Sequence, residues 1–264
     1  MKEKINWWIT EHKILSGILC TVFLCAVYTK VCIFLDAAWW VIVLVNVLLL
    51  AVVWAYVEAS PMFLIQKSID ELNDNCNPYP LKENLERLLA KKWNSSMHQS
   101  LMIDYALVHR SIGEYERNYE MLHAINIDKT AIDPIIKVVY YNNLMDAAFY
   151  TERYEEASIW YTKMAQVYAD AKKSEEKQEL EAIVEAGAAL YAFCQKDYAK
   201  TIEVLDEIVH KDIRMKVDLS LLYARTCILT GNTETAKEKL QYVIEKGNQL
   251  YSVKIAEQLL AELE

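Results

Sequence analysis

The chain divides near residue 58 into an almost uniformly apolar segment and a segment in which apolar and charged residues recur at helical spacing. Residues 14–57 contain only two charged side chains, Lys30 and Asp36. A helix needs about 20 apolar residues to cross the hydrocarbon core of a bilayer, so this stretch is long enough for two passes and too long for one. Because Asp36 is the natural divider, the pattern predicts transmembrane helices over 14–35 and 37–57.

Aromatic residues lie at the ends of the predicted spans. Trp7 and Trp8 precede the first span, and Trp39 and Trp40 begin the second, as expected of the belts at the two membrane–water interfaces. A cleaved signal peptide would have a shorter apolar run, of about 7–15 residues. A buried hairpin of a soluble protein is the other alternative, and the scarcity of polar atoms disfavours it. Residues 1–58 are therefore predicted to form a membrane anchor.

Basic residues predict the orientation of this anchor. Lys2, Lys4 and Lys13 flank the first span and Lys67 follows the second, whereas the hairpin side has only Lys30. Lysine and arginine are enriched on the cytoplasmic side of membrane proteins. We therefore expect a multi-pass protein of the inner or plasma membrane with both termini in the cytoplasm.

Small residues form a stripe on the first predicted span. Gly17, Thr21 and Cys25 recur at four-residue spacing, which lets another helix approach closely. The favoured interpretation is packing against the second span, with Asn46 hydrogen-bonding across the hairpin. The alternative is contact with a helix of another membrane protein.

Residues 59–264 are predicted to be all-α, because apolar residues recur there at three- and four-residue spacing and strand-like alternation is absent. Four turn-like sequences repeat, at intervals of 39, 44 and 35 residues. Periods of this length are typical of stacked helical hairpins. The turn sequences are G-E-Y-E-R-N-Y from Gly113, E-R-Y-E-E-A-S from Glu152, K-D-Y-A-K-T-I from Lys196 and G-N-T-E-T-A-K from Gly231.

These repeats resemble the tetratricopeptide (TPR) family, in which small residues flank a turn often written G-x-Y. The repeat at Gly231 fits best, with Ala224 before the turn and Ala236 and Leu240 after it, whereas Asn118 stands where another repeat should have a small residue. The resemblance implies a TPR-like α-solenoid of about four to five hairpins, and the whole chain is therefore predicted to consist of two transmembrane helices followed by this solenoid. Residues 249–264 then suit a capping helix.

In the family that the repeats resemble, the first helix of each repeat lines a concave groove that binds partners. Carried over by repeat phase, this implies a mixed apolar and polar surface, which suits an extended peptide or a partner helix. The implied groove residues are Ile103, Leu107, Arg110, Asn142, Asp146, Phe149, Leu190, Phe193, Leu221 and Arg225.

The sequence contains no motif of catalysis or cofactor binding. Six scattered cysteines and five histidines lack metal-ligand spacing, and the isolated glycines cannot form a phosphate-binding loop. The net charge of −9 belongs to residues 59–264 and disfavours nucleic acid as a partner. We therefore predict no enzyme activity, no cofactor and no metal.

Two functional hypotheses remain. The first is a membrane-anchored scaffold or adaptor that binds a protein or peptide partner in the groove. The second is a membrane-tethered regulator that senses a peptide there. The sequence does not identify the partner.

Overall fold

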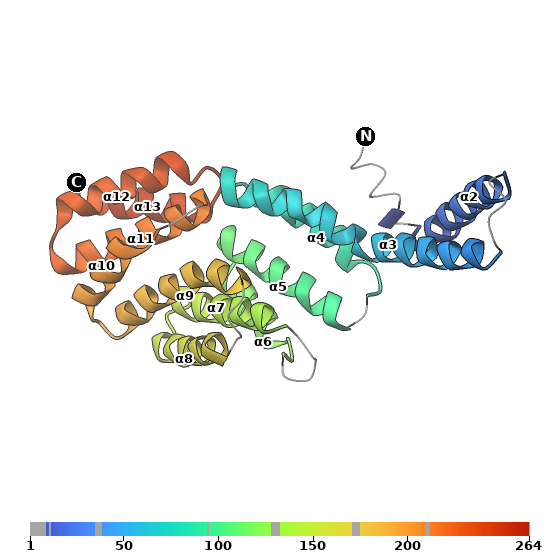
Figure 1. The fold of residues 1–264 in the computed structure, drawn as a ribbon. Helices are drawn as coiled ribbons and strands as arrows, with labels where there is room; N and C mark the ends of the chain where they lie inside the picture. Colours follow the sequence, from blue (N-terminus) through green and yellow to red (C-terminus); the bar gives the residue numbers. More distant parts are fainter. Residues whose placement is uncertain are drawn as a thin grey trace. The chain divides into compact units, whose positions relative to one another are not determined.

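The computed structural model shows an all-helical protein that divides into two compact units, the first ending at Ser68 and the second beginning at Ile69 (Figure 1). Among the described residues there is no β-strand. The structure describes residues 9–10, 12–34, 39–93, 95–127, 133–170, 175–209 and 212–263.

The first unit contains helix α2 (Lys13–Phe34) and most of helix α3 (Trp39–Asn75). Helix α3 is long and apolar enough to cross a membrane, and α2 is apolar over Leu15–Val31. The predicted end of a span at Val57 is not a helix end, because α3 continues for its full 37 residues, about 55 Å at 1.5 Å per residue. The predicted divider, Asp36, lies outside the described residues.

Helix α3 continues through a proline, Pro61, that stands close to the predicted boundary. Pro61 has no N–H to donate to the Val57 carbonyl, a loss that usually breaks or kinks a helix. The Ser60 hydroxyl instead donates to that carbonyl at 2.9 Å, and Thr10 Oγ1 lies 2.9 Å from Ser60 Oγ. Because the orphaned carbonyl keeps a partner, the helix runs through the predicted boundary between residues 58 and 59.

The predicted small-residue stripe packs within the hairpin at its first position. A Cβ atom on Gly17 would lie 3.2 Å from the Trp54 ring of α3. Asn46 of α3 donates to Thr29 of α2 at 3.4 Å and, more closely, to its own Ile42 carbonyl at 2.9 Å. Thr21 is half-buried, and its hydroxyl has no partner among the described residues. Cys25 of the stripe is also half-buried. The contacts of Gly17 and Asn46 agree with packing inside the hairpin.

The described residues of the second unit form the end of α3 and ten further helices. Each predicted turn separates two of them, and helices that follow one another along the chain form contacting pairs, such as α5 with α6 and α7 with α8. The first helices of successive pairs also contact one another, α5 with α7, α7 with α9, and α9 with α11. The helices are α4 (Tyr79–Leu89), α5 (Ser95–Ser111), α6 (Tyr115–His123), α7 (Pro134–Tyr150), α8 (Tyr154–Asp170), α9 (Glu175–Cys194), α10 (Tyr198–Glu207), α11 (Ile213–Thr230), α12 (Thr233–Lys246) and α13 (Tyr251–Glu262).

The four repeated turns share one backbone geometry. Gly113, Glu152, Lys196 and Gly231 each adopt a positive φ, between 60° and 86°. In every case the N–H of the following residue donates to the carbonyl five residues back, the 6→1 bond of a Schellman motif that satisfies the helix end. These bonds join Glu114 to His109, Arg153 to Ala148, Asp197 to Ala192 and Asn232 to Cys227, at 2.9, 2.7, 3.0 and 2.9 Å.

Asn118 departs from the repeat pattern, and its side chain forms no hydrogen bond within the described part of the chain. Its side chain is fully buried, and neither amide atom has a partner among the described residues. Leaving a buried polar group unsatisfied costs about 1–3 kcal/mol, and alanine also has the higher helix propensity. We expect Asn118→Ala to stabilise the protein by about 1 kcal/mol in chemical denaturation followed by circular dichroism. The exposed Glu120→Ala on the same helix should change stability by less than about 0.5 kcal/mol. A loss of stability in the Asn118 variant would contradict the prediction.

Candidate functional site

The second unit contains a cavity of about 770 Å³ whose walls come mainly from α5, α7, α9 and α11. Two predicted groove residues do not line it. Ile103 is 2% exposed and packs in the core between α5 and α7, and Phe193 packs edge-to-face on Phe149 and Tyr198. The other eight line the cavity, namely Leu107, Arg110, Asn142, Asp146, Phe149, Leu190, Leu221 and Arg225.

Helix caps fix where two of the walls begin. Asp133 caps α7, with its carboxylate accepting from the Ile135 N–H at 2.8 Å and Pro134 at the first helical position. Asp212 caps α11 by accepting from the Met215 N–H at 2.6 Å, and its side chain also lines the cavity. Caps of this kind satisfy N–H groups that the first helical turn leaves unpaired. They therefore define the first residues of α7 and α11.

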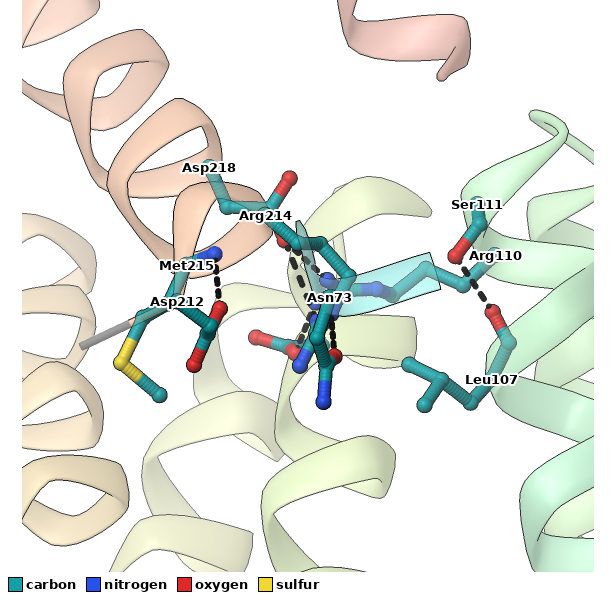
Figure 2. A network of polar contacts seen from close by, with 9 residues as sticks. Asn73, Leu107, Arg110, Ser111, Asp212, Arg214, Met215 and Asp218 are labelled. Atoms are coloured by element: carbon teal, nitrogen blue, oxygen red, sulfur yellow. Dashed lines mark hydrogen bonds and ion pairs between the residues drawn. The ribbon is translucent and has the colours of Figure 1, made fainter. Parts of the chain in front are cut away.

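A buried arginine links three helices at the cavity wall. The Arg110 guanidinium of α5 donates to Asp146 of α7 and to Asp218 of α11. Figure 2 shows Arg110 extending from α5 towards Asp218 and Arg214. Burial raises the pKa of the Asp146 carboxyl, and the nearby Arg110 opposes this shift. Burial alone would lower the pKa of Arg110, but the two carboxylates together raise it above its ordinary value, so the cation is retained.

A second arginine connects the last turn of α3 to this cluster. Arg214 Nε donates to Asn73 Oδ1 at 2.9 Å, and its guanidinium lies 3.6 Å from Asp218 (Figure 2). Two further bonds join the start and the end of the second unit. Asn248 Nδ2 donates to the Asn75 carbonyl at 2.7 Å, and the Gln249 N–H donates to the Cys76 carbonyl at 3.2 Å. The first and last segments of this unit therefore hold each other.

Arg225 lies against aromatic rings and forms no ion pair with any described residue. Its guanidinium carbon is 5.7 Å from the centre of the Phe149 ring and 5.9 Å from that of Tyr150. Tyr150 in turn stacks on Tyr115, with ring centres 4.5 Å apart. Burial raises the pKa of Tyr150 to about 12, so its phenol stays neutral. The stack leaves the donors of Arg225 available to an acceptor in the cavity.

Two asparagines of α7 add unused donors. Asn142 lines the cavity and forms no side-chain hydrogen bond to another described residue. Asn143 is only 4% exposed, yet its Nδ2 has no acceptor in the described part of the chain. A buried amide without a partner is costly. The Asn143 Nδ2 is covered by the protein, so of these two side chains it is Asn142 that can donate to a ligand carbonyl in the cavity.

Sequence reasoning missed Asn73, Arg214 and Asp218. Arg214 and Asp218 stand four residues apart on α11, the spacing of an intrahelical ion pair, and this was the only signal for them. Asn73 is held at the cavity by its hydrogen bond to Arg214, which lies 141 positions away in the sequence. Periodicity and local motifs do not predict a contact at this separation.

Comparisons with protein-family models, curated proteins and solved structures found no match for this chain. Within the described residues there is no group of three or more histidine, cysteine, aspartate or glutamate side chains that could hold a metal ion.

Proposed function

We propose that this protein is a membrane-anchored scaffold or adaptor whose residues 59–264 form a TPR-like solenoid that binds a protein or peptide partner. The observation that supports this most is the gathering of eight predicted groove residues, from four helices, around one cavity of about 770 Å³. The cavity offers aromatic and aliphatic walls together with a few unused polar groups, the composition typical of ligand sites.

The anchor is proposed to consist of two spans that form a hairpin. Of the 25 large apolar side chains exposed in the described residues, 20 lie between Leu15 and Phe63. In a soluble protein an apolar surface of this extent would need to be covered by a partner. The hydrocarbon core of a bilayer would cover it without one, which supports the anchor. The lysines that flank the hairpin, more numerous on the side of its two ends, support a cytoplasmic position for both termini.

The alternative proposal is a membrane-tethered regulator that senses a peptide. Two observations favour it over a pure scaffold. The cavity volume lies within the range of roughly 300–1,000 Å³ found for small-ligand sites, which suits a short segment better than a folded domain. Asn73, which contacts Arg214 at the cavity wall, belongs to α3, the helix that is apolar enough to cross a membrane. A bound peptide that moved Arg214 would therefore act on α3.

The partner-binding role can be tested with Asn142→Ala/Arg225→Ala in the full-length chain. Truncating interface anchors can cost about 2 kcal/mol or more each, so the proteins that co-purify with wild type should be lost. Helicity and membrane location should not change, since neither side chain has a hydrogen bond or ion pair with another described residue. Glu155→Ala/Glu257→Ala changes two exposed residues and is the matched control. Retention of every partner by the cavity variant, or loss in both variants, would argue against the site.

The proposed topology has its own test. Protease added to intact cells should leave a C-terminal tag uncleaved, because both termini are proposed to be cytoplasmic. The tag should be digested once the cells are permeabilised. Rapid digestion in intact cells would place the repeats outside and reverse the orientation.

A further inference from the structure

The charges around the cavity are unequally paired. Arg110, Arg214, Asp146 and Asp218 form a buried group of two cations and two anions that neutralise one another. The remaining charges are one arginine, Arg225, and four carboxylates. Within the described residues none of these four carboxylates forms an ion pair. They are Glu181 and Glu185 of α9, Glu207 of α10 and Asp212 at the start of α11.

The carboxylates lie beside apolar side chains. Ile183 and Ala186 of α9 and Met215 and Leu222 of α11 line the same cavity. A ligand that fills it must therefore bring apolar surface to these walls and positive charge to the carboxylates. The side chains of Asn142 and Arg225 are a separate observation, because both line the cavity and neither has a hydrogen bond or ion pair with another described residue, so their donors suit the carbonyls of a peptide.

We propose that the cavity binds a short extended peptide segment in which basic residues alternate with apolar ones. The basic side chains pair with Glu181 and Glu185, the apolar side chains pack on α9 and α11, and main-chain carbonyls accept from Asn142 and Arg225. This inference rests on the proposed function and specifies the chemistry of its partner. Complementary charge across an interface favours the matching partner and rejects its opposite, because like charges repel.

The test measures peptide binding to the full chain in phosphatidylcholine nanodiscs, whose zwitterionic lipid does not attract cationic peptides. The probes are fluorescein-labelled Leu-Lys-Leu-Lys-Leu and Leu-Glu-Leu-Glu-Leu, followed by fluorescence anisotropy. The basic peptide should bind at least tenfold more tightly than the acidic one. Its affinity should fall with rising salt, which screens the attraction between the lysines and the cavity carboxylates. Glu181→Gln/Glu185→Gln should weaken it about five- to tenfold, because two partly exposed ion pairs are removed.

A control separates specific binding from general attraction to an acidic protein. Glu155→Gln/Glu257→Gln removes the same charge from exposed positions outside the cavity and should leave the affinity unchanged. Equal weakening in both double variants, or tighter binding of the acidic peptide, would overturn the proposed ligand class.

The outcomes also distinguish this inference from the function on which it rests. If neither peptide binds while Asn142→Ala/Arg225→Ala still loses its co-purifying partners, the ligand class is wrong and the cavity remains the binding site. If neither peptide binds and that variant keeps its partners, both proposals fail.

Discussion

Replacement of Arg110 by methionine is expected to destabilise the second unit by about 3–5 kcal/mol, the cost of leaving buried carboxylates without their cation. The Arg110 side chain is 9% exposed, and those of Asp146 and Asp218 are 14% and 20% exposed. Asp218 keeps Arg214 at 3.6 Å. Asp146 has no other cation within ion-pair distance in the described structure, so most of the cost should arise there.

The pH dependence of this variant provides a signature that simple loss of packing would not. Burial already raises the pKa of Asp146, and Arg110 opposes the shift. Without the arginine, that pKa rises further. A carboxyl whose folded pKa lies above its unfolded value makes the fold less stable as pH rises from the unfolded pKa through the folded one. The destabilisation by Arg110→Met should therefore be smallest near the unfolded pKa of an aspartate, about 3.9, and should grow as pH rises above it, when unfolding is measured with denaturant at several pH values.

Two comparison variants complete this test. Arg117→Met removes an arginine that is 59% exposed and lies 3.7 Å from Glu114, and an exposed pair of this kind contributes about 0–1 kcal/mol. Arg110→Met/Asp146→Leu removes the main orphaned charge together with the cation and should recover much of the lost stability. A pH-independent loss, or a double variant no more stable than Arg110→Met, would mean that Arg110 acts by packing alone.

The repeat register accounts for what could be predicted from the sequence. Leu107, Asp146, Leu190 and Arg225 each precede a repeated turn residue by six positions, and all four line the cavity. In these hairpins the left-handed residue fixes where the first helix ends, so counting back from it selects one helix face. Local chemistry of the turn thus sets the positions of residues far apart in space.

The repeat register does not predict residue positions that depend on core packing or on contacts between distant parts of the sequence. Ile103 precedes Gly113 by ten positions, as Asn142 and Leu221 precede their own turn residues, and the repeat phase predicts it on the groove. The structure instead buries it in a core that α5 shares with α7. Hydropathy predicts a boundary near residue 58, but it does not report that α3 continues through this position, where Ser60 satisfies the carbonyl that Pro61 leaves free. The contact between Asn73 and Arg214 joins the start of the second unit to α11, and neither repeat phase nor composition predicts it.

A close contact at Gly113 leads to the second large expected effect. Gly113 has a φ of +86°, and a Cβ atom there would lie 2.3–2.7 Å from ring atoms of Tyr251 in α13. Gly231 occupies the equivalent turn with a φ of +80°, but a Cβ atom there would meet nothing within 4 Å. The two glycines therefore share the same backbone requirement and differ in the space around them.

Gly113→Ala is expected to cost about 2–5 kcal/mol, and Gly231→Ala only about 1–2 kcal/mol. Both variants carry the strain of a left-handed alanine, about 1–2 kcal/mol, whereas the Gly113 variant must also displace the Tyr251 ring, and overpacking typically costs about 1–3 kcal/mol. Chemical denaturation of the three proteins, followed by circular dichroism, gives the difference. The comparison is repeated in a Tyr251→Ala background, where the ring is absent. There, adding Gly113→Ala should lower the free energy of unfolding by about as much as Gly231→Ala lowers it in the wild type. Equal losses of unfolding free energy for the two glycine variants would contradict the packing of α13 against the hairpin of α5 and α6. The contact between these distant segments of the second unit would then not contribute to its stability.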